Sequence, residues 1–125
     1  MLPSTKARVR ERAGNAYEYC HLHQDDSPLA VLHIEHVIPK IHGGTDDVDN
    51  LALVCIDCNL HKGPNLTGID PETGAVTELF HPRHQAWDDH FTWNGIYLAS
   101  NTPIGRTTIR VLNMNSEDQM ALRSS

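Results

Sequence analysis

The chain has 125 residues and a formal net charge of −6 at pH 7. This length suits one domain, and the acidic balance argues against strong non-specific binding to DNA, because phosphate contacts require Lys and Arg. No apolar run approaches the length of a membrane span, and the first residues lack the apolar core of a signal peptide. We therefore expect no membrane contact. The odd count of three cysteines favours reduced, metal-binding thiols, which indicates a cytoplasmic protein.

The N-terminal segment predicts a helix over residues 5–13, with Ser4 as its N-cap and Gly14 just after its end. This segment concentrates basic residues, namely Lys6, Arg8, Arg10 and Arg12. Arg8 and Arg12 share one helix face, so they form either a solvated surface or a stripe that contacts phosphates.

The next segments predict a strand, a loop, a second strand and a helix. Residues 24–28 are typical of a loop, and residues 30–38 are rich in β-branched and apolar side chains, which favours a strand ending at Pro39. A long loop over residues 42–49 leads to a short strand at 51–54, antiparallel to the first. Residues 55–62 predict a short helix that Gly63 and Pro64 end.

The second half predicts further short elements. Residues 70–74 indicate a turn between two strands, the later one including residues 76–80, and residues 83–91 indicate a short helix. Residues 93–98 suggest a strand interrupted by Asn94-Gly95. Thr102-Pro103 is a helix start with proline at its first position, and Ser116 with Gln119 matches a capping box for a last helix.

One cluster of polar residues suits hydrolysis of a phosphodiester. Such a reaction needs a general base and a cation that neutralises developing charge. His36 is the candidate base, because histidine ordinarily titrates near neutrality. Glu35 and Asn59 offer the oxygen donors that Mg²⁺ prefers, and His61 is a rival ligand to Asn59. The Asn50 amide both donates and accepts, so we expect it to pin the long loop.

These residues resemble the active-site motif of HNH nucleases. The resemblance rests on Glu35-His36, then Asn50, then Asn59 beside Cys58, and on the surrounding His-x-Glu-His-x-Ile-Pro, Gly-Gly and Asn-Leu-x-Leu-x-Cys-x-x-Cys-Asn. Weaker similarities to one bacterial branch of the family extend over residues 8–115. The resemblance implies a ββα-metal fold and DNA cleavage with one Mg²⁺ or Mn²⁺ ion. It also implies His36 as the base.

The resemblance further implies a structural zinc held by two Cys-x-x-Cys pairs. Cys55 and Cys58 form the second pair and Cys20 belongs to the first, but Tyr17 stands where its other cysteine is usual. Structural zinc takes four ligands from Cys and His. We therefore expect a site of Cys20, His23, Cys55 and Cys58, with His21 as the runner-up for His23. The alternative is a decayed site whose cysteines pack as small apolar residues.

Together these features predict an α+β fold over residues 1–125, with a ββα-metal core at about 15–65 and a C-terminal strand–helix extension at about 66–125. The predicted activity is metal-dependent DNA cleavage. Lys62, at the end of the predicted helix, either contacts a phosphate or caps the last helical carbonyls. A non-catalytic, zinc-stabilised module that binds nucleic acid or protein is the main alternative. An unrelated small zinc protein is a third.

Overall fold

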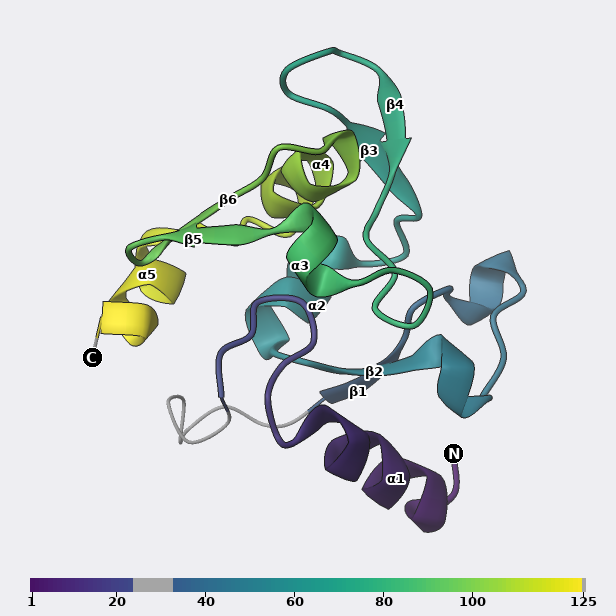
Figure 1. Cartoon of the computed structure of the whole chain (residues 1–125). Coiled ribbons are helices and arrows are strands. Elements are labelled where there is room, and N and C mark those ends of the chain that lie inside the picture. Colours follow the sequence, from purple (N-terminus) through teal and green to yellow (C-terminus); the bar gives the residue numbers. More distant parts are fainter. Residues whose placement is uncertain (24–32, 125) are drawn as a thin grey trace.

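The computed structural model describes residues 1–23 and 33–124, and its helices and small antiparallel sheets form the expected α+β fold (Figure 1). The predicted loop at 24–28 and the first residues of the predicted strand at 30–38 lie outside the described residues. None of the helices in the described part of the chain has both the length and the apolar character needed to span a bilayer.

Helix α1 spans Pro3–Ala13. Its N-cap is Leu2, which makes no side-chain capping bond, so the prediction of a Ser4 cap is wrong. Proline explains the earlier start, because its fixed φ and missing N–H suit the first helical position. The predicted end is confirmed, since Gly14 adopts a left-handed φ of 62° and donates its N–H to carbonyls of the last turn.

The Arg12 side chain fastens α1 to the chain beside it. Its Nη1 donates to the carbonyl of Val48 at 2.8 Å, and its Nη2 donates to the carbonyl of Leu51 at 2.7 Å. The guanidinium therefore holds two elements together. A phosphate-contacting stripe with Arg8 consequently loses one of its two cations.

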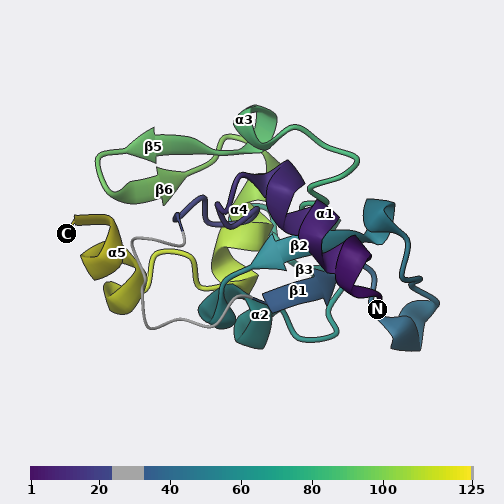
Figure 2. The ribbon, with the colours of Figure 1, turned by 90° about the horizontal axis from the view of Figure 1, so that it is seen from below.

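A β-hairpin followed by a helix forms the centre of the fold. Strands β1 (His33–His36) and β2 (Leu51–Val54) pair antiparallel with Glu35 opposite Ala52, and helix α2 (Ile56–Lys62) follows directly. Helix α1 packs against β2 and α2 packs against β1, so the hairpin lies between them (Figures 1 and 2). Strand β2 is buried along its whole length, which explains its uniformly apolar sequence.

The loop between the two strands is more ordered than the sequence indicates. It contains two 3₁₀ turns, η2 (Lys40–His42) and η3 (Val48–Asn50). Strand β1 ends at His36, before the predicted end at Ile38, because the backbone N–H of Ile38 bonds to a side chain of the loop rather than to a strand.

The second half adds two hairpins and three helices. Strands β3 (Thr67–Ile69) and β4 (Val76–Glu78) pair, as do β5 (Thr92–Asn94) and β6 (Tyr97–Ala99). The predicted strand at 93–98 is thus wrong: Asn94-Gly95 does not interrupt a strand but turns a hairpin, with Gly95 at φ 62°.

Two of the helices in this half begin where the sequence predicts. Helix α4 (Pro103–Val111) begins after Thr102, whose hydroxyl accepts from the N–H of Gly105. Helix α5 (Glu117–Ser124) follows Ser116, whose hydroxyl accepts from the backbone N–H of Gln119 at 3.2 Å. The predicted helix at 83–91 is reduced to α3 (Trp87–His90).

A single hydrophobic cluster draws on both halves of the chain. It combines Val9 of α1, Leu53 of β2, Phe80 after β4, Leu98 of β6 and Met114 after α4, all at most 1% exposed. Phe80 contacts Tyr19 and Phe91 edge to face, at ring-centroid distances of 6.2 and 5.2 Å. The C-terminal elements therefore share a core with the hairpin.

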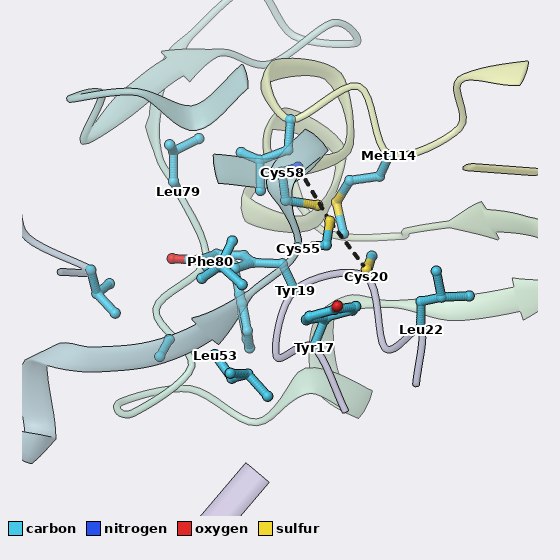
Figure 3. Close-up of a cluster of buried hydrophobic side chains, with 14 of the residues drawn as sticks. Tyr17, Tyr19, Cys20, Leu22, Leu53, Cys55, Cys58, Leu79, Phe80 and Met114 are labelled. Carbon is cyan, nitrogen blue, oxygen red and sulfur yellow. Dashed lines mark hydrogen bonds between the residues drawn. The ribbon is translucent and has the colours of Figure 1, made fainter. Parts of the chain in front are cut away.

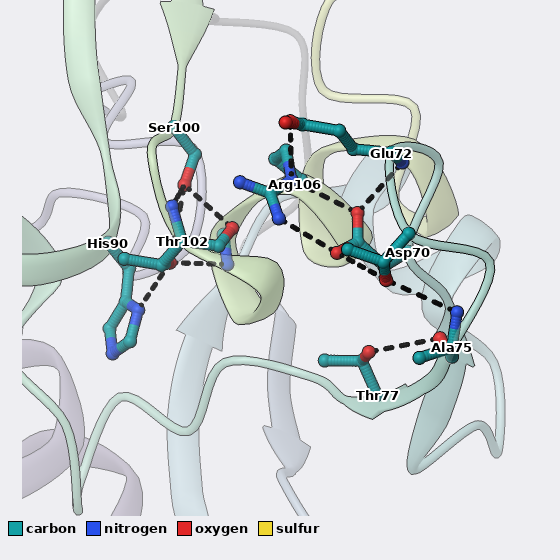
Figure 4. Close-up of polar contacts among 10 residues, drawn as sticks. Asp70, Glu72, Ala75, Thr77, His90, Ser100, Thr102 and Arg106 are labelled. Atoms are coloured by element: carbon teal, nitrogen blue, oxygen red, sulfur yellow. Dashed lines mark hydrogen bonds and ion pairs between the residues drawn. The ribbon is translucent and has the colours of Figure 1, made fainter.

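A buried ion pair joins the β3–β4 turn to α4. Asp70 is fully buried and accepts from Arg106 Nε at 3.0 Å and Nη2 at 2.9 Å, and it also accepts from the Thr73 hydroxyl and the backbone N–H of Glu72 (Figure 4). Hydrogen bonds from Arg106 hold the pKa of Asp70 well below its ordinary value. The folded protein therefore favours the charged form of Asp70 more than the unfolded chain does.

We expect Asp70→Asn to lower the unfolding temperature at pH 7, because an amide cannot accept all of these bonds. A carboxylate whose pKa is depressed by folding stabilises the protein above its unfolded pKa of about 3.9 and loses that stabilisation as pH falls. The difference in unfolding temperature between the variant and the parent should therefore become smaller below about pH 4. Thermal denaturation followed by circular dichroism measures it, with the exposed Asp89→Asn as the matched control. A gap that stays constant with pH would contradict this account.

Candidate active site and cysteine cluster

Two residues at the end of β1, Glu35 and His36, line the same pocket of about 520 Å³. Adjacent strand residues ordinarily point to opposite faces, but β1 ends at His36, which relaxes that alternation. Residues from both strands, the loop and α2 complete the lining, among them Ala52, Val54, Pro39, Lys40, Asn59 and Lys62.

Glu35 and Asn59 are in direct contact across the β1–α2 junction. Asn59 Nδ2 donates to Glu35 Oε1 at 3.1 Å. A half-turn of the amide would bring the Asn59 oxygen to the same distance from the carboxylate. Two oxygens bound to one octahedral Mg²⁺ stand about 3 Å apart, given metal–oxygen bonds of about 2.0–2.1 Å. The donor pair therefore fits a small hard cation.

The rival ligand His61 lies elsewhere. Its Nδ1 bonds to the carbonyl of Asp57 within α2 at 2.7 Å, and its side chain is exposed and outside the pocket lining. Lys62 is buried, and its Nζ donates to the carbonyl of Val37 at 2.9 Å. Lys62 thus ties the end of α2 to the end of β1, so the prediction that it caps the last helical carbonyls is wrong.

His36 has a partner that the sequence did not reveal. Its Nε2 lies 2.7 Å from Oδ1 of Asp46, and Lys40 Nζ lies 3.4 Å from the same oxygen. The bond to His36, helped by Lys40, lowers the pKa of Asp46. The available signal was only the acidic run after Gly43-Gly44, which gives no indication of which carboxylate meets the imidazole.

Asn50 closes the loop that joins His36 to Asp46. Its Oδ1 accepts from the N–H of Ile38 at 2.8 Å, and its Nδ2 donates to the carbonyls of Ile38 at 3.0 Å and Thr45 at 2.9 Å. The structure thus has the loop-pinning contacts expected of this amide. Ile38 is two residues after His36 and Thr45 is one before Asp46, so the same bonds bring the imidazole and the carboxylate together.

Gly44 is required in this closure. A Cβ at this position would meet the carbonyl oxygen of Ile38 at 1.7 Å and the Asn50 amide nitrogen at 2.9 Å. The second glycine of the Gly-Gly pair therefore lets the loop backbone pass close to the end of β1.

We expect Asn50→Asp to lower the free energy of unfolding by about 1–3 kcal/mol, because a carboxylate cannot donate the two bonds to Ile38 and Thr45. Urea denaturation measures this loss. Asn65→Asp, at an exposed position, is the matched control and should be neutral. Gly44→Ala should reproduce the loss by steric means, and full stability in both loop variants would overturn the assignment.

The three cysteines meet in the core. The sulfurs of Cys20, Cys55 and Cys58 all lie within 4.8 Å of one another, with Cys20 and Cys55 3.8 Å apart (Figure 3). Cys58 donates its backbone N–H to Cys55 Sγ at 3.3 Å. Hydrogen bonds within the cluster lower the pKa of Cys55 and raise those of Cys20 and Cys58. All three are free thiols, so the donor set fits a thiolate-bound zinc.

The predicted histidine ligand is not part of this cluster. Among the described residues the group contains three cysteines only, so the structure does not support His23 as the fourth ligand. His23 instead forms a backbone bridge with Ala16 that closes the turn. His21 stacks on Trp87 at a centroid distance of 3.8 Å. A Cys-x-x-His spacing is local, whereas the path of this turn decides which side chains reach the sulfurs.

Tyr17 occupies the place of the missing cysteine. It is fully buried, and its hydroxyl has no hydrogen-bond partner among the described residues. Burial raises the pKa of this phenol, and the neighbouring Cys55 and Cys20 raise it further. The hydroxyl therefore stays protonated near neutral pH.

One family model matches a segment of this chain. Residues 18–65 match the model of the HNH endonuclease family. Searches of curated proteins and of solved structures found no significant match. The matched segment contains the hairpin, helix α2, the pocket residues and all three cysteines.

Proposed function

From the premise that residues 18–65 form an HNH endonuclease domain, we propose that this protein is a metal-dependent nuclease that hydrolyses DNA phosphodiester bonds. The observation that carries the proposal is one pocket lined by Glu35, His36 and Asn59, in which the carboxylate and the carboxamide touch. These are a base and an oxygen-donor pair, the two parts that phosphodiester hydrolysis requires.

His36 acts as the general base in this proposal. When Asp46 accepts the proton of Nε2, the lone pair of the neutral ring lies on Nδ1, which then takes the proton of the attacking water. Asp46 is a positioning residue, because it fixes the ring and its tautomer without touching the substrate. Asn50 acts one step further away, by holding the loop that presents Asp46.

Glu35 and Asn59 hold the catalytic cation, with Mg²⁺ or Mn²⁺ favoured by their oxygen donors. When bound, the ion supplies Lewis-acid stabilisation of the charge that develops on the phosphate. Burial lowers the pKa of Lys62, and the negative charge of the neighbouring Glu35 opposes this shift. The Lys62 ammonium donates to the Val37 carbonyl, and both residues line the pocket.

Few basic side chains are available to contact the phosphates of a DNA substrate. Arg12, Arg83, Arg106 and Arg123 bond to oxygens of the protein itself. Lys6 and Arg8 on α1, and Lys40 at the pocket, remain exposed. Non-specific affinity for DNA scales with the number of phosphates neutralised. We therefore infer weak intrinsic binding that falls steeply with salt.

A non-catalytic binding module is the second candidate. It is favoured by the engagement of His36 Nε2 with Asp46, which occupies one nitrogen of the candidate base. A parent protein that shifts DNA in binding assays with Mg²⁺ but leaves plasmid intact would support this module over the nuclease.

We expect His36→Ala to reduce plasmid cleavage about 10²-fold or more while DNA affinity and circular dichroism stay unchanged, because it removes only the base. His42→Ala is the matched control, since His42 is an exposed histidine of the same loop. Gel assays with Mg²⁺ measure both. Parental cleavage rates in His36→Ala would exclude the assignment.

The metal assignment predicts different outcomes for two neighbouring residues of α2. Asn59→Ala should raise the Mg²⁺ concentration for half-maximal cleavage by about 10-fold or more, the scale typical of losing a group that supports a metal. His61→Ala should leave it unchanged, because His61 bonds within its own helix. The reverse pattern would transfer the ligand role to His61.

A further inference from the structure

The cysteine cluster lacks a fourth ligand from any Cys, His, Asp or Glu among the described residues. Structural zinc is almost always four-coordinate and tetrahedral. The fourth donor, if the protein supplies it, must therefore be a residue of another type that reaches the three sulfurs.

Gln119 of α5 lies outside the family-matched segment and reaches the sulfur of Cys55. It is 2% exposed, and its Nε2 lies 3.6 Å from Cys55 Sγ and 3.3 Å from Asp57 Oδ2. Its Oε1 is buried without a hydrogen-bond partner in the described part of the chain. Ser116 caps α5 through the Gln119 N–H, which fixes where this side chain enters the core.

Two distances in the cluster match those of a tetrahedral zinc site. Zn–S bonds of about 2.3 Å place two sulfurs about 3.8 Å apart, and a Zn–O bond of about 2.1 Å places sulfur and oxygen about 3.6 Å apart. The Cys20 and Cys55 sulfurs are 3.8 Å apart, and the amide end of Gln119 is 3.6 Å from Cys55 Sγ. A half-turn of the amide exchanges its two terminal atoms and presents the oxygen at this distance.

We propose that the Gln119 amide oxygen completes a four-coordinate zinc site with the sulfurs of Cys20, Cys55 and Cys58. The amide half-turn removes the proton that Asp57 accepts, and Asp57 is only half-buried, so its carboxylate turns to water instead. The ion then cross-links the turn at Cys20, the start of α2 and helix α5. This proposal does not depend on nuclease activity.

The test uses the 125-residue chain, reduced and loaded with Zn²⁺. X-ray absorption at the zinc edge should report three sulfur ligands and one oxygen ligand, and four light-atom ligands or only two sulfurs would overturn the proposal. Competition with a chromophoric chelator gives the affinity. Gln119→Leu should weaken Zn²⁺ binding about 10-fold or more, the scale of a lost metal-supporting group.

Two further variants separate a ligand from a mere hydrogen-bond donor. Gln119→Glu keeps an oxygen donor but cannot donate to a thiolate, so it should bind Zn²⁺ at least as tightly as the parent. Affinity as low as in Gln119→Leu would reduce Gln119 to a donor and overturn the proposal. Tyr17→Phe removes the other buried hydroxyl and should leave affinity unchanged; a loss there alone would assign the site to Tyr17 instead. If one variant folds poorly, the ligand count from X-ray absorption on the parent protein still tests the proposal.

Discussion

The arrangement of the pocket depends on one buried carboxamide. Asn50 bonds to Ile38 and Thr45, and those two residues flank the stretch that contains the η2 turn and the Gly-Gly pair. By drawing the two ends of this stretch together, Asn50 converts a sequence separation of ten residues into a 2.7 Å contact between His36 and Asp46. The position of the His36 imidazole therefore depends on the loop that presents Asp46 as well as on strand β1.

The sequence predicts the local features well because they depend on neighbouring residues. Gly14, Gly63 and Thr102 mark helix ends through backbone conformation and capping, and the apolar run of β2 follows from burial on every side. The α+β fold with a hairpin followed by α2 was predictable for the same reason. The Asn94-Gly95 turn was predicted wrongly because the two strands it joins have only three residues each.

Long-range contacts were not predictable. The partner of His36 is one of three nearby aspartates, and only the closed loop selects Asp46. Gln119 stands 64 residues after Cys55, and its pairing with Ser116 in a capping box suggested a purely local role. In the structure only half of that box forms: Ser116 accepts from Gln119, while the Gln119 side chain turns to the cysteines. His23 was expected beside Cys20 on the opposite assumption, that near neighbours in sequence converge, and among the described residues it is not part of the sulfur group.

Cys58 and Asn59 are consecutive residues of α2, so the sulfur cluster and the proposed nuclease pocket are one peptide bond apart on the same helical turn. A chelating agent added to stop the reaction would act on both places at once. Inhibition by such an agent therefore does not identify the ion that takes part in chemistry. Adding back one cation at a time, with the thiols kept reduced, distinguishes loss of the folded structure from loss of the catalytic ion.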